Sequence, residues 1–193
     1  MRISLIGPPG VGKSTQAQRL SRTLTTYTPR IPAGQPVPDE AIMRLVTPHA
    51  RRLGGWILDG FPTSLSQARV LDDELEESGG DALDHVILLE GPGDEELIHR
   101  ILSGRLHSQA TGMVYHLERD PPPKPEVRLD LGPFVKLDDD AEEAIRRRLA
   151  TYHREADALQ GHYAGKGILV TVDAGRSIEE VSGGILAILG RRT

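Results

Sequence analysis

The chain has 193 residues, which suits one α/β domain with a small insertion and is long enough to bury a core. A net charge of −5 and an aromatic content of 4% argue against a nucleic-acid partner, which needs a basic face or stacking side chains. The absence of cysteine excludes disulfides and thiolate metal sites and fits a cytoplasmic protein. Neither a membrane span of roughly 20 apolar residues nor a signal peptide is predicted.

A phosphate-binding loop is predicted near the start of the chain. Residues 7–14 read GPPGVGKS and match the pattern G-x-x-x-x-G-K-[ST]. An apolar run precedes the loop and a helix-forming stretch follows it, which is the context that the motif requires. In this motif backbone N–H groups surround the phosphates, the lysine reaches the β- and γ-phosphates, and the hydroxyl ligates Mg²⁺. We therefore expect ATP phosphates at Gly10, Val11, Gly12, Lys13, Ser14 and Thr15.

Four short apolar runs predict strands, each bounded by Gly, Pro or Asp and followed by a helical pattern: 3–6, 56–58, 86–89 and 168–172. Continuous apolar runs are typical of strands that are buried on both faces of a parallel sheet. The expected fold is therefore the three-layer α/β/α arrangement of P-loop proteins, with helices on both sides of the sheet.

Two helices near the end of the chain carry clear local signals. The last is expected to begin at Ser177, because residues 177–180 read SIEE and form a capping box. A longer helix is expected after residues 138–140. It carries four residues at the spacing of a buried face: Ala144, Ile145, Leu149 and Tyr152.

Two segments interrupt the alternation of strands and helices. Residues 23–38 contain four prolines, which predicts an extended connector with room for a short strand near 27–31. Residues 104–138 are polar and rich in proline, and they are too many for a plain loop, so we interpret them as an inserted lid. A proline-rich ligand for a partner domain is the alternative. The core domain would then comprise residues 1–103 and 139–193.

Six strings, in family order and covering nearly the whole chain, resemble adenylate kinase: LIGPPGVGKSTQA (5–17), GQPVPDEAI (34–42), LDGFPTSLSQA (58–68), GMVYH (112–116), DDAEEAIRRRL (139–149) and VDAGRSIEEV (172–181). The resemblance implies a P-loop core and a mobile lid that closes over ATP. It also implies reversible phosphoryl transfer from ATP·Mg²⁺ to a nucleoside monophosphate, with AMP as the first candidate.

The resemblance also implies roles on the ATP side. Asp59 corresponds to the acidic residue that helps Ser14 to organise magnesium, although a turn or helix-cap aspartate is the alternative. Arg100 and Arg105 correspond to arginines that stack on ATP and grip its phosphates. Arg148, which has no acidic residue four positions earlier, corresponds to the arginine at the transferring phosphate. The predicted catalytic residues are Lys13, Asp59, Arg105 and Arg148.

On the acceptor side, the sequence departs from the family. Gln67 matches the glutamine that reads the acceptor adenine, although residues 64–67 also form a capping box. The helical insert for the monophosphate is replaced by the connector 23–38, and Thr63 stands where a second acceptor arginine is expected after the Phe-Pro turn at 61–62. Arg30 in the connector is the best-placed substitute. Arg146 is a further candidate, although Glu142 four residues earlier favours a solvated ion pair.

Two other functions are compatible with these departures. Losing two phosphate clamps costs roughly 3–6 kcal/mol of binding, so the acceptor could be a non-phosphorylated small molecule instead. The chain could also be a weakly active ATP-binding module.

A metal site in the lid is a minor alternative. Histidines 107 and 116 flank the lid's turn, and either one could ligate a metal with Asp120 or Asp130. A hydrogen-bonded lid is the simpler prediction.

Overall fold

A computed structural model describes residues 1–24, 55–77, 82–124 and 131–190. Its centre is a parallel sheet with the order β2-β1-β3-β7. The strands are β1 (Arg2–Ile6), β2 (Trp56–Asp59), β3 (His85–Glu90) and β7 (Leu169–Asp173). All four coincide with predicted strands, with ends shifted by one residue at most. The prediction of a parallel sheet is therefore confirmed.

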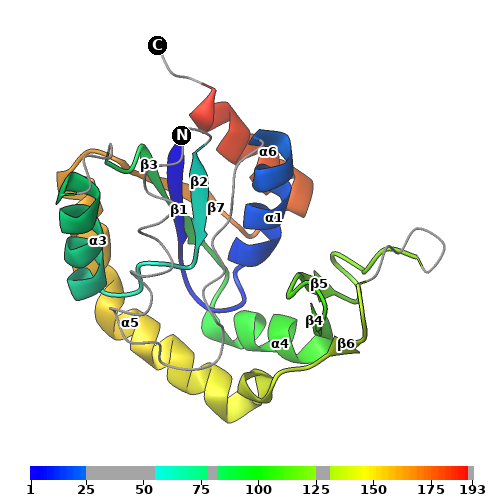
Figure 1. The fold of residues 1–193 in the computed structure, drawn as a ribbon. Helices are drawn as coiled ribbons and strands as arrows, with labels where there is room; N and C mark the ends of the chain where they lie inside the picture. The colour runs from blue at the N-terminus through cyan, green and yellow to red at the C-terminus, as the bar shows by residue number, and fades with distance from the viewer. Residues whose placement is uncertain (25–54, 78–81, 125–130, 191–193) are drawn as a thin grey trace.

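Helices cover both faces of this sheet (Figure 1). They are α1 (Lys13–Leu24), α3 (Leu65–Glu77), α4 (Asp94–Gly104), α5 (Glu142–Gly165) and α6 (Ile178–Leu189). Alternate strand residues point to opposite faces. Leu5 and Ile87 are buried in one core cluster that includes α1 and α6. Leu58 and Leu88 are buried in a second cluster with residues of α3 and α5. Burial on both faces explains why the strands read as continuous apolar runs.

The predicted helix signals are confirmed with two corrections. Ser177 caps α6 in a capping box with Glu180. In α5, two of the four residues at core spacing are buried, whereas Ala144 and Tyr152 are only partly buried. Helix α1 continues to Leu24, so the predicted connector starts too early. The rest of the connector, with its proposed strand, lies outside the described residues.

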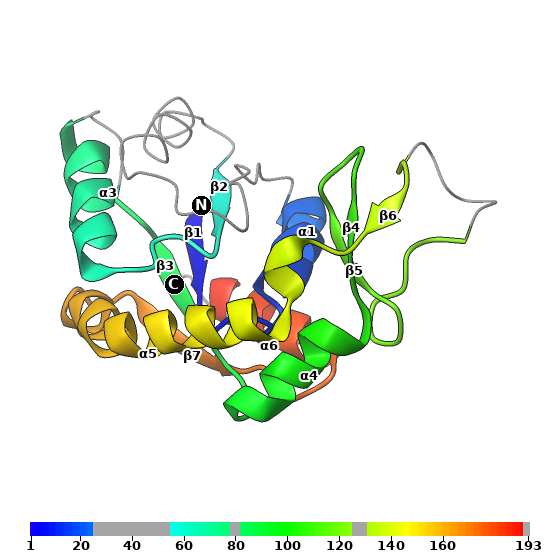
Figure 2. The same ribbon diagram turned by 90° about the horizontal axis from the view of Figure 1, so that it is seen from below.

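A second, smaller sheet lies within the predicted insert. Strands β4 (Arg105–Ser108), β5 (Val114–His116) and β6 (Phe134–Val135) form an antiparallel sheet in the order β5-β4-β6. Tyr115 packs edge-on against Phe134, with ring centroids 5.5 Å apart. The small sheet stands at one end of the molecule beside α1 and α4 (Figure 2). A 3-10 turn, η2 (Asp138–Asp140), leads from it into α5. Among the described residues, no helix is long and apolar enough to cross a membrane.

A buried carboxylate joins two helices on one face of the main sheet. Asp72 of α3 accepts hydrogen bonds from His162 Nε2 of α5 at 2.7 Å and from Nζ of Lys166, the residue that caps the end of α5, at 2.6 Å. Its side chain is buried, so both donors bind an oxygen that is shielded from water. Hydrogen bonds to charged groups contribute more than neutral ones.

We expect Asp72→Asn to lower the free energy of unfolding by about 1–3 kcal/mol, because an amide oxygen is a weaker acceptor for Lys166 than a carboxylate. Urea denaturation measures the change. The matched control is Asp73→Asn, since Asp73 is the next residue of α3 and is exposed. Equal unfolding midpoints for the two variants would contradict the assigned role of Asp72.

Candidate active site

The phosphate-binding loop connects the end of β1 to the start of α1. Gly7, Gly10 and Gly12 have φ values of +141°, +80° and +109°, which side chains other than glycine rarely adopt. A Cβ at Gly7 would also lie 2.5 Å from the carbonyl oxygen of Leu89. At Gly12 no atom lies within 4 Å of that position, so backbone conformation alone selects glycine there. The predicted loop is therefore built in the conformation that its glycines permit.

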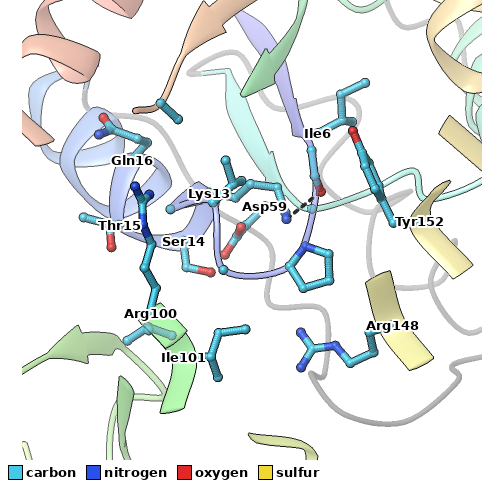
Figure 3. A pocket seen from close by; sticks show the side chains of 18 of the residues that line it. Ile6, Lys13, Ser14, Thr15, Gln16, Asp59, Arg100, Ile101, Arg148 and Tyr152 are labelled. Atoms are coloured by element: carbon cyan, nitrogen blue, oxygen red, sulfur yellow. Dashed lines mark hydrogen bonds between the residues drawn. The ribbon is translucent and has the colours of Figure 1, made fainter. Parts of the chain in front are cut away.

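Lys13 crosses back over this loop. Its Nζ donates hydrogen bonds to the carbonyl oxygens of Gly7 and Pro8, each at 2.8 Å (Figure 3). Burial lowers the pKa of Lys13 to about 8, against the opposing attraction of Asp59. The ammonium group is thus poorly hydrated, and these two hydrogen bonds go to neutral carbonyl groups.

Asp59 and Ser14 lie next to each other at the carboxyl edge of the sheet. Asp59 ends β2, and Leu5 of β1 is its register partner. The Ser14 hydroxyl donates a hydrogen bond to the Asp59 carboxylate, and burial raises the pKa of that carboxyl while Ser14 and Lys13 oppose the rise. No group of three acidic, histidine or cysteine residues in the described parts of the chain forms a metal site. One hydroxyl and one carboxylate do fit Mg²⁺, which usually keeps several of its waters.

Two predicted arginines are held by acidic residues of the turn η2. Arg105 Nη1 lies 3.0 Å from Asp140 Oδ1, and Arg148 Nη1 lies 2.9 Å from Asp139 Oδ2. Arg148 therefore has an acidic partner, although none is present one helical turn before it. Burial and the charge of Arg105 lower the pKa of Arg148. Both guanidinium groups are thereby oriented before any phosphate binds.

This cluster also contains buried polar atoms without a hydrogen bond. They are Asp139 Oδ1, Asp140 Oδ2 and His107 Nε2. His107 Nε2 lies 3.9 Å from Asp140 Oδ2, and burial together with Arg105 lowers the pKa of its imidazole. The charges around the two arginines are thus incompletely paired in this arrangement.

His116, in contrast, is fully used in hydrogen bonds. Its Nε2 lies 2.9 Å from the carbonyl oxygen of Arg100, and its Nδ1 accepts from the backbone N–H groups of Glu118 and Arg119. These partners place the proton on Nε2 and leave no lone pair for a metal. The prediction of a hydrogen-bonded lid is confirmed for His116. Asp130, one of the ligands considered, lies outside the described residues.

One pocket of about 790 Å³ brings most of the predicted residues together. This volume falls in the range of small-molecule sites, roughly 300–1,000 Å³. It is lined by the phosphate loop and by these predicted site residues: Asp59, Gln67, Arg100, Arg105 and Arg148. Arg146 is not among the lining residues, since it pairs with Glu95 at 2.8 Å and with Glu142. Arg30 lies outside the described residues.

Gln67 lies on the first turn of α3 and lines the pocket. Its Oε1 accepts from the backbone N–H of Thr63 at 2.8 Å and from the Thr63 hydroxyl at 2.9 Å. Its own N–H donates to Ser64 Oγ at 3.3 Å. Ser64 therefore caps the helix as predicted, and the Gln67 side-chain oxygen binds Thr63, the residue before the cap. The preceding Phe61–Pro62 peptide is cis.

Sequence reasoning missed four residues that line this pocket: Arg119, Arg147, Tyr152 and Arg176. Arg147 has Glu143 four residues before it, a spacing that favours a solvated ion pair on the surface. That pair exists at 2.6 Å, and Arg147 nevertheless lines the pocket. Positions 144, 147, 148, 151 and 152 form a stripe at helical spacing, which was the available signal. Arg119 and Arg176 had no comparable signal.

Comparison with known proteins agrees with this geometry. A family model described as adenylate kinase matches residues 25–168. The chain is 37% identical to the adenylate kinase of Streptomyces coelicolor, and the alignment covers 99% of both proteins. It is 32% identical to the adenylate kinase of Lachnospira eligens over 98% of this chain and all of that protein.

The chain belongs to the adenylate kinase family. The family consists of nucleoside monophosphate kinases, so the predicted enzyme class is confirmed. The alignment with the Streptomyces coelicolor adenylate kinase spans 222 positions, more than the 193 residues of this chain. That relative therefore contains residues with no counterpart here.

The pKa of Lys13 predicts that ATP binding takes up protons. Phosphate oxygens favour the charged ammonium, so binding raises a pKa that is about 8 in the free protein. At pH 8.5 we expect uptake of about three quarters of a proton, and a fall in ATP affinity as the pH rises further. Calorimetry in buffers of different ionisation enthalpy measures the uptake.

The measurement is made with a chelator present, so that magnesium binding does not contribute to the proton exchange. Lys13→Met serves as the control, because its side chain has no titrating group. Zero uptake by the unmodified protein at pH 8.5 would show that Lys13 is already fully charged before ATP binds.

Proposed function

We propose that this protein transfers the γ-phosphoryl group of ATP, bound as its magnesium complex, to a nucleoside monophosphate, with AMP as the preferred acceptor. The observation that carries the proposal is the single pocket that extends from the phosphate loop to Gln67. It contains a donor end with Lys13 and an acceptor end with Gln67, and two oriented arginines line it as well.

Lys13 would exchange the carbonyl oxygens of Gly7 and Pro8 for the β- and γ-phosphate oxygens of ATP. Ser14 and Asp59 are the residues that would hold Mg²⁺, which supplies charge neutralisation at the β- and γ-phosphates. Since Asp59 ends a buried strand beside the loop, this pair needs no large rearrangement to reach the ion.

Arg105 and Arg148 would neutralise charge on the phosphoryl group during transfer. Catalysis of this kind is positioning combined with electrostatic stabilisation, and a phosphate acceptor needs no general base. Asp139 and Asp140 hold the two guanidinium groups before the reaction. Arg100, on α4, would contact the ATP nucleoside.

We also propose that residues 104–138 act as a lid that closes over ATP and excludes water, with residues 1–103 and 139–193 as the core. Two contacts between the proposed lid and α1 support this proposal, because they are weak enough for the lid to move away from the core. Gln18 Nε2 lies 3.4 Å from the carbonyl oxygen of Val114, and Arg19 lies 3.7 Å from Asp120. Both contacts are long for their type.

The assay for this function incubates the protein with ATP·Mg²⁺ and a panel of monophosphates, nucleosides and sugars, and follows ADP. We expect turnover with AMP, and a loss of about 10²–10³-fold in kcat for Lys13→Ala, because an oriented charge at the transferring group is removed. Tight ATP binding without turnover on any acceptor would instead identify a binding module. Activity that persists in Lys13→Ala would indicate a contaminating kinase.

The acceptor phosphate needs positive charge that Thr63 does not supply. Arg147 lines the pocket next to Arg148, and its partner Glu143 is 87% exposed, so that pair is weak and readily exchanged. Arg147 is therefore our candidate for the acceptor phosphate, besides Arg30 and Arg146, which were predicted from the sequence.

We expect Arg147→Ala to raise the KM for AMP about 10-fold or more, with the KM for ATP changed by less than about twofold. Arg146→Ala is the matched control, since it removes the same charge one residue away, from a side chain that pairs with Glu95 outside the pocket. A larger effect from Arg146→Ala would support the original prediction for that residue and contradict the role of Arg147.

A further inference from the structure

His107 is a buried histidine that does not line the pocket. It lies on β4 two residues after Arg105, so the two side chains point to the same face of that strand. Both approach the carboxylate of Asp140, one at each oxygen. Arg105 Nη1 lies 3.0 Å from Oδ1, and His107 Nε2 lies 3.9 Å from Oδ2. The first contact is a hydrogen bond, whereas the second is too long to be one.

The two atoms of that second contact are both unsatisfied. His107 Nε2 and Asp140 Oδ2 are buried and have no hydrogen-bond partner. The side chains are only 9% and 3% exposed, so both atoms are shielded from water. Buried polar atoms in proteins are nearly always hydrogen-bonded. A movement of about 1 Å would bring this ring nitrogen and this carboxylate oxygen into hydrogen-bond range.

The charges around His107 account for the missing bond. Among the described residues, four charged groups act on its imidazole: Arg105, Arg148, Asp139 and Asp140. Two guanidinium groups and two carboxylates balance each other, so a third cation would have no partner. Burial together with the charge of Arg105 lowers the pKa of His107. The imidazole is therefore largely uncharged at pH 7 while Arg105 is bound to Asp140.

This balance changes when Arg105 binds a phosphate instead. Arg105 lines the pocket and Asp140 does not, so the guanidinium can turn to a ligand that the carboxylate does not reach. Asp140 would then be a buried carboxylate without a cation, which is unfavourable. His107 is the titratable group that faces its free oxygen. Loss of the guanidinium and exposure to the carboxylate both favour the charged imidazole.

We propose that His107 is a positioning residue that replaces Arg105 at Asp140: when Arg105 moves to the phosphates of ATP, the imidazole takes up one proton from the solvent and its Nε2–H bonds to Asp140 Oδ2. The imidazolium restores the charge that Asp140 loses, so Arg105 is released at a smaller cost. No covalent bond other than this N–H forms or breaks. The proposal rests on the phosphoryl transfer proposed above and extends it to a residue outside the pocket.

The first test is an NMR titration of the histidine ring protons, with and without a non-hydrolysable ATP analogue and Mg²⁺. The chain has seven histidines, and the signal of His107 is the one that His107→Gln removes. We expect the pKa of His107 to rise when the analogue binds. We expect a rise without any nucleotide in Arg105→Ala, because this substitution removes the guanidinium from Asp140 permanently.

The second test measures the Kd of the same analogue by calorimetry at two pH values. His107→Gln keeps a hydrogen-bond donor and cannot carry a charge. We expect it to bind the analogue about 3- to 10-fold more weakly than the unmodified protein at pH 6, and less than about twofold more weakly at pH 8.5. The pKa is lower in the free protein than in the complex, so the contribution of His107 is present at low pH and is lost as the pH rises through the pKa of the complex.

His153→Gln is the matched control. His153 is an exposed histidine that also faces a carboxylate, at 2.9 Å from Asp94 Oδ1, and it does not line the pocket. We expect this variant to bind the analogue like the unmodified protein at both pH values.

A loss of affinity in His107→Gln that is equal at both pH values would show that His107 only packs, and it would overturn the inference. An unchanged pKa of His107 in the complex or in Arg105→Ala would overturn it too. All of these results leave the proposed function intact. If the unmodified protein does not bind the analogue, the proposed function itself fails, whereas the measurement on Arg105→Ala needs no nucleotide and still decides whether His107 responds to the loss of Arg105.

Discussion

The two hydrogen bonds that Lys13 donates to carbonyl oxygens of its own loop set the electrostatics of the whole site. A buried ammonium is costly unless it is paired, and here its hydrogen-bond acceptors are two neutral carbonyls, with Asp59 contributing through space. The glycines make this arrangement possible, because only their backbone conformations bring Gly7 and Pro8 round to the ammonium. The loop is therefore most stable with an anion, since phosphate oxygens replace neutral acceptors with charged ones.

The arginines that surround this loop share a second constraint. Arg105 and Arg148 are both held by acidic residues of one short turn, so the phosphate binding that we propose would exchange one anionic partner for another instead of stripping water from a free guanidinium. Preorganised charge of this kind stabilises a transition state without reorganisation at the moment of reaction. The unbonded atoms of Asp139, Asp140 and His107 show that this pairing is incomplete, which leaves the exchange energetically accessible.

The sequence was sufficient wherever a residue's role follows from its neighbours in the chain. Strands buried on both faces appear as continuous apolar runs, and Ser177 with Glu180 specifies a helix start by itself. Arg146 and Arg147 show where this reasoning stops, because each has a glutamate four residues earlier and each forms that ion pair. Only the packing of α4 against α5 turns Arg146 toward Glu95 and leaves Arg147 at the pocket. Arg119 is likewise placed by the hydrogen bond that its neighbour His116 donates to the carbonyl oxygen of Arg100 on α4.

The two ends of the pocket differ in how they discriminate ligands. Seven cationic side chains line the pocket, so charge dominates over most of it: Lys13, Arg100, Arg105, Arg119, Arg147, Arg148 and Arg176. At the acceptor end, Thr63 supplies hydrogen bonds where the family has an arginine, and these bonds orient the carbonyl of Gln67 toward the turn before α3. These bonds hold the Gln67 amide in one orientation, and base recognition is the role that we propose for it. Under the proposed function, acceptor selection depends on hydrogen bonding at Gln67, and α5, the helix that also carries Arg148, supplies Arg147 as a candidate for the charge at the acceptor phosphate. One helix would thus serve both acceptor binding and transfer, which explains how a chain without the usual arginine after the Phe61–Pro62 turn can retain the family's reaction.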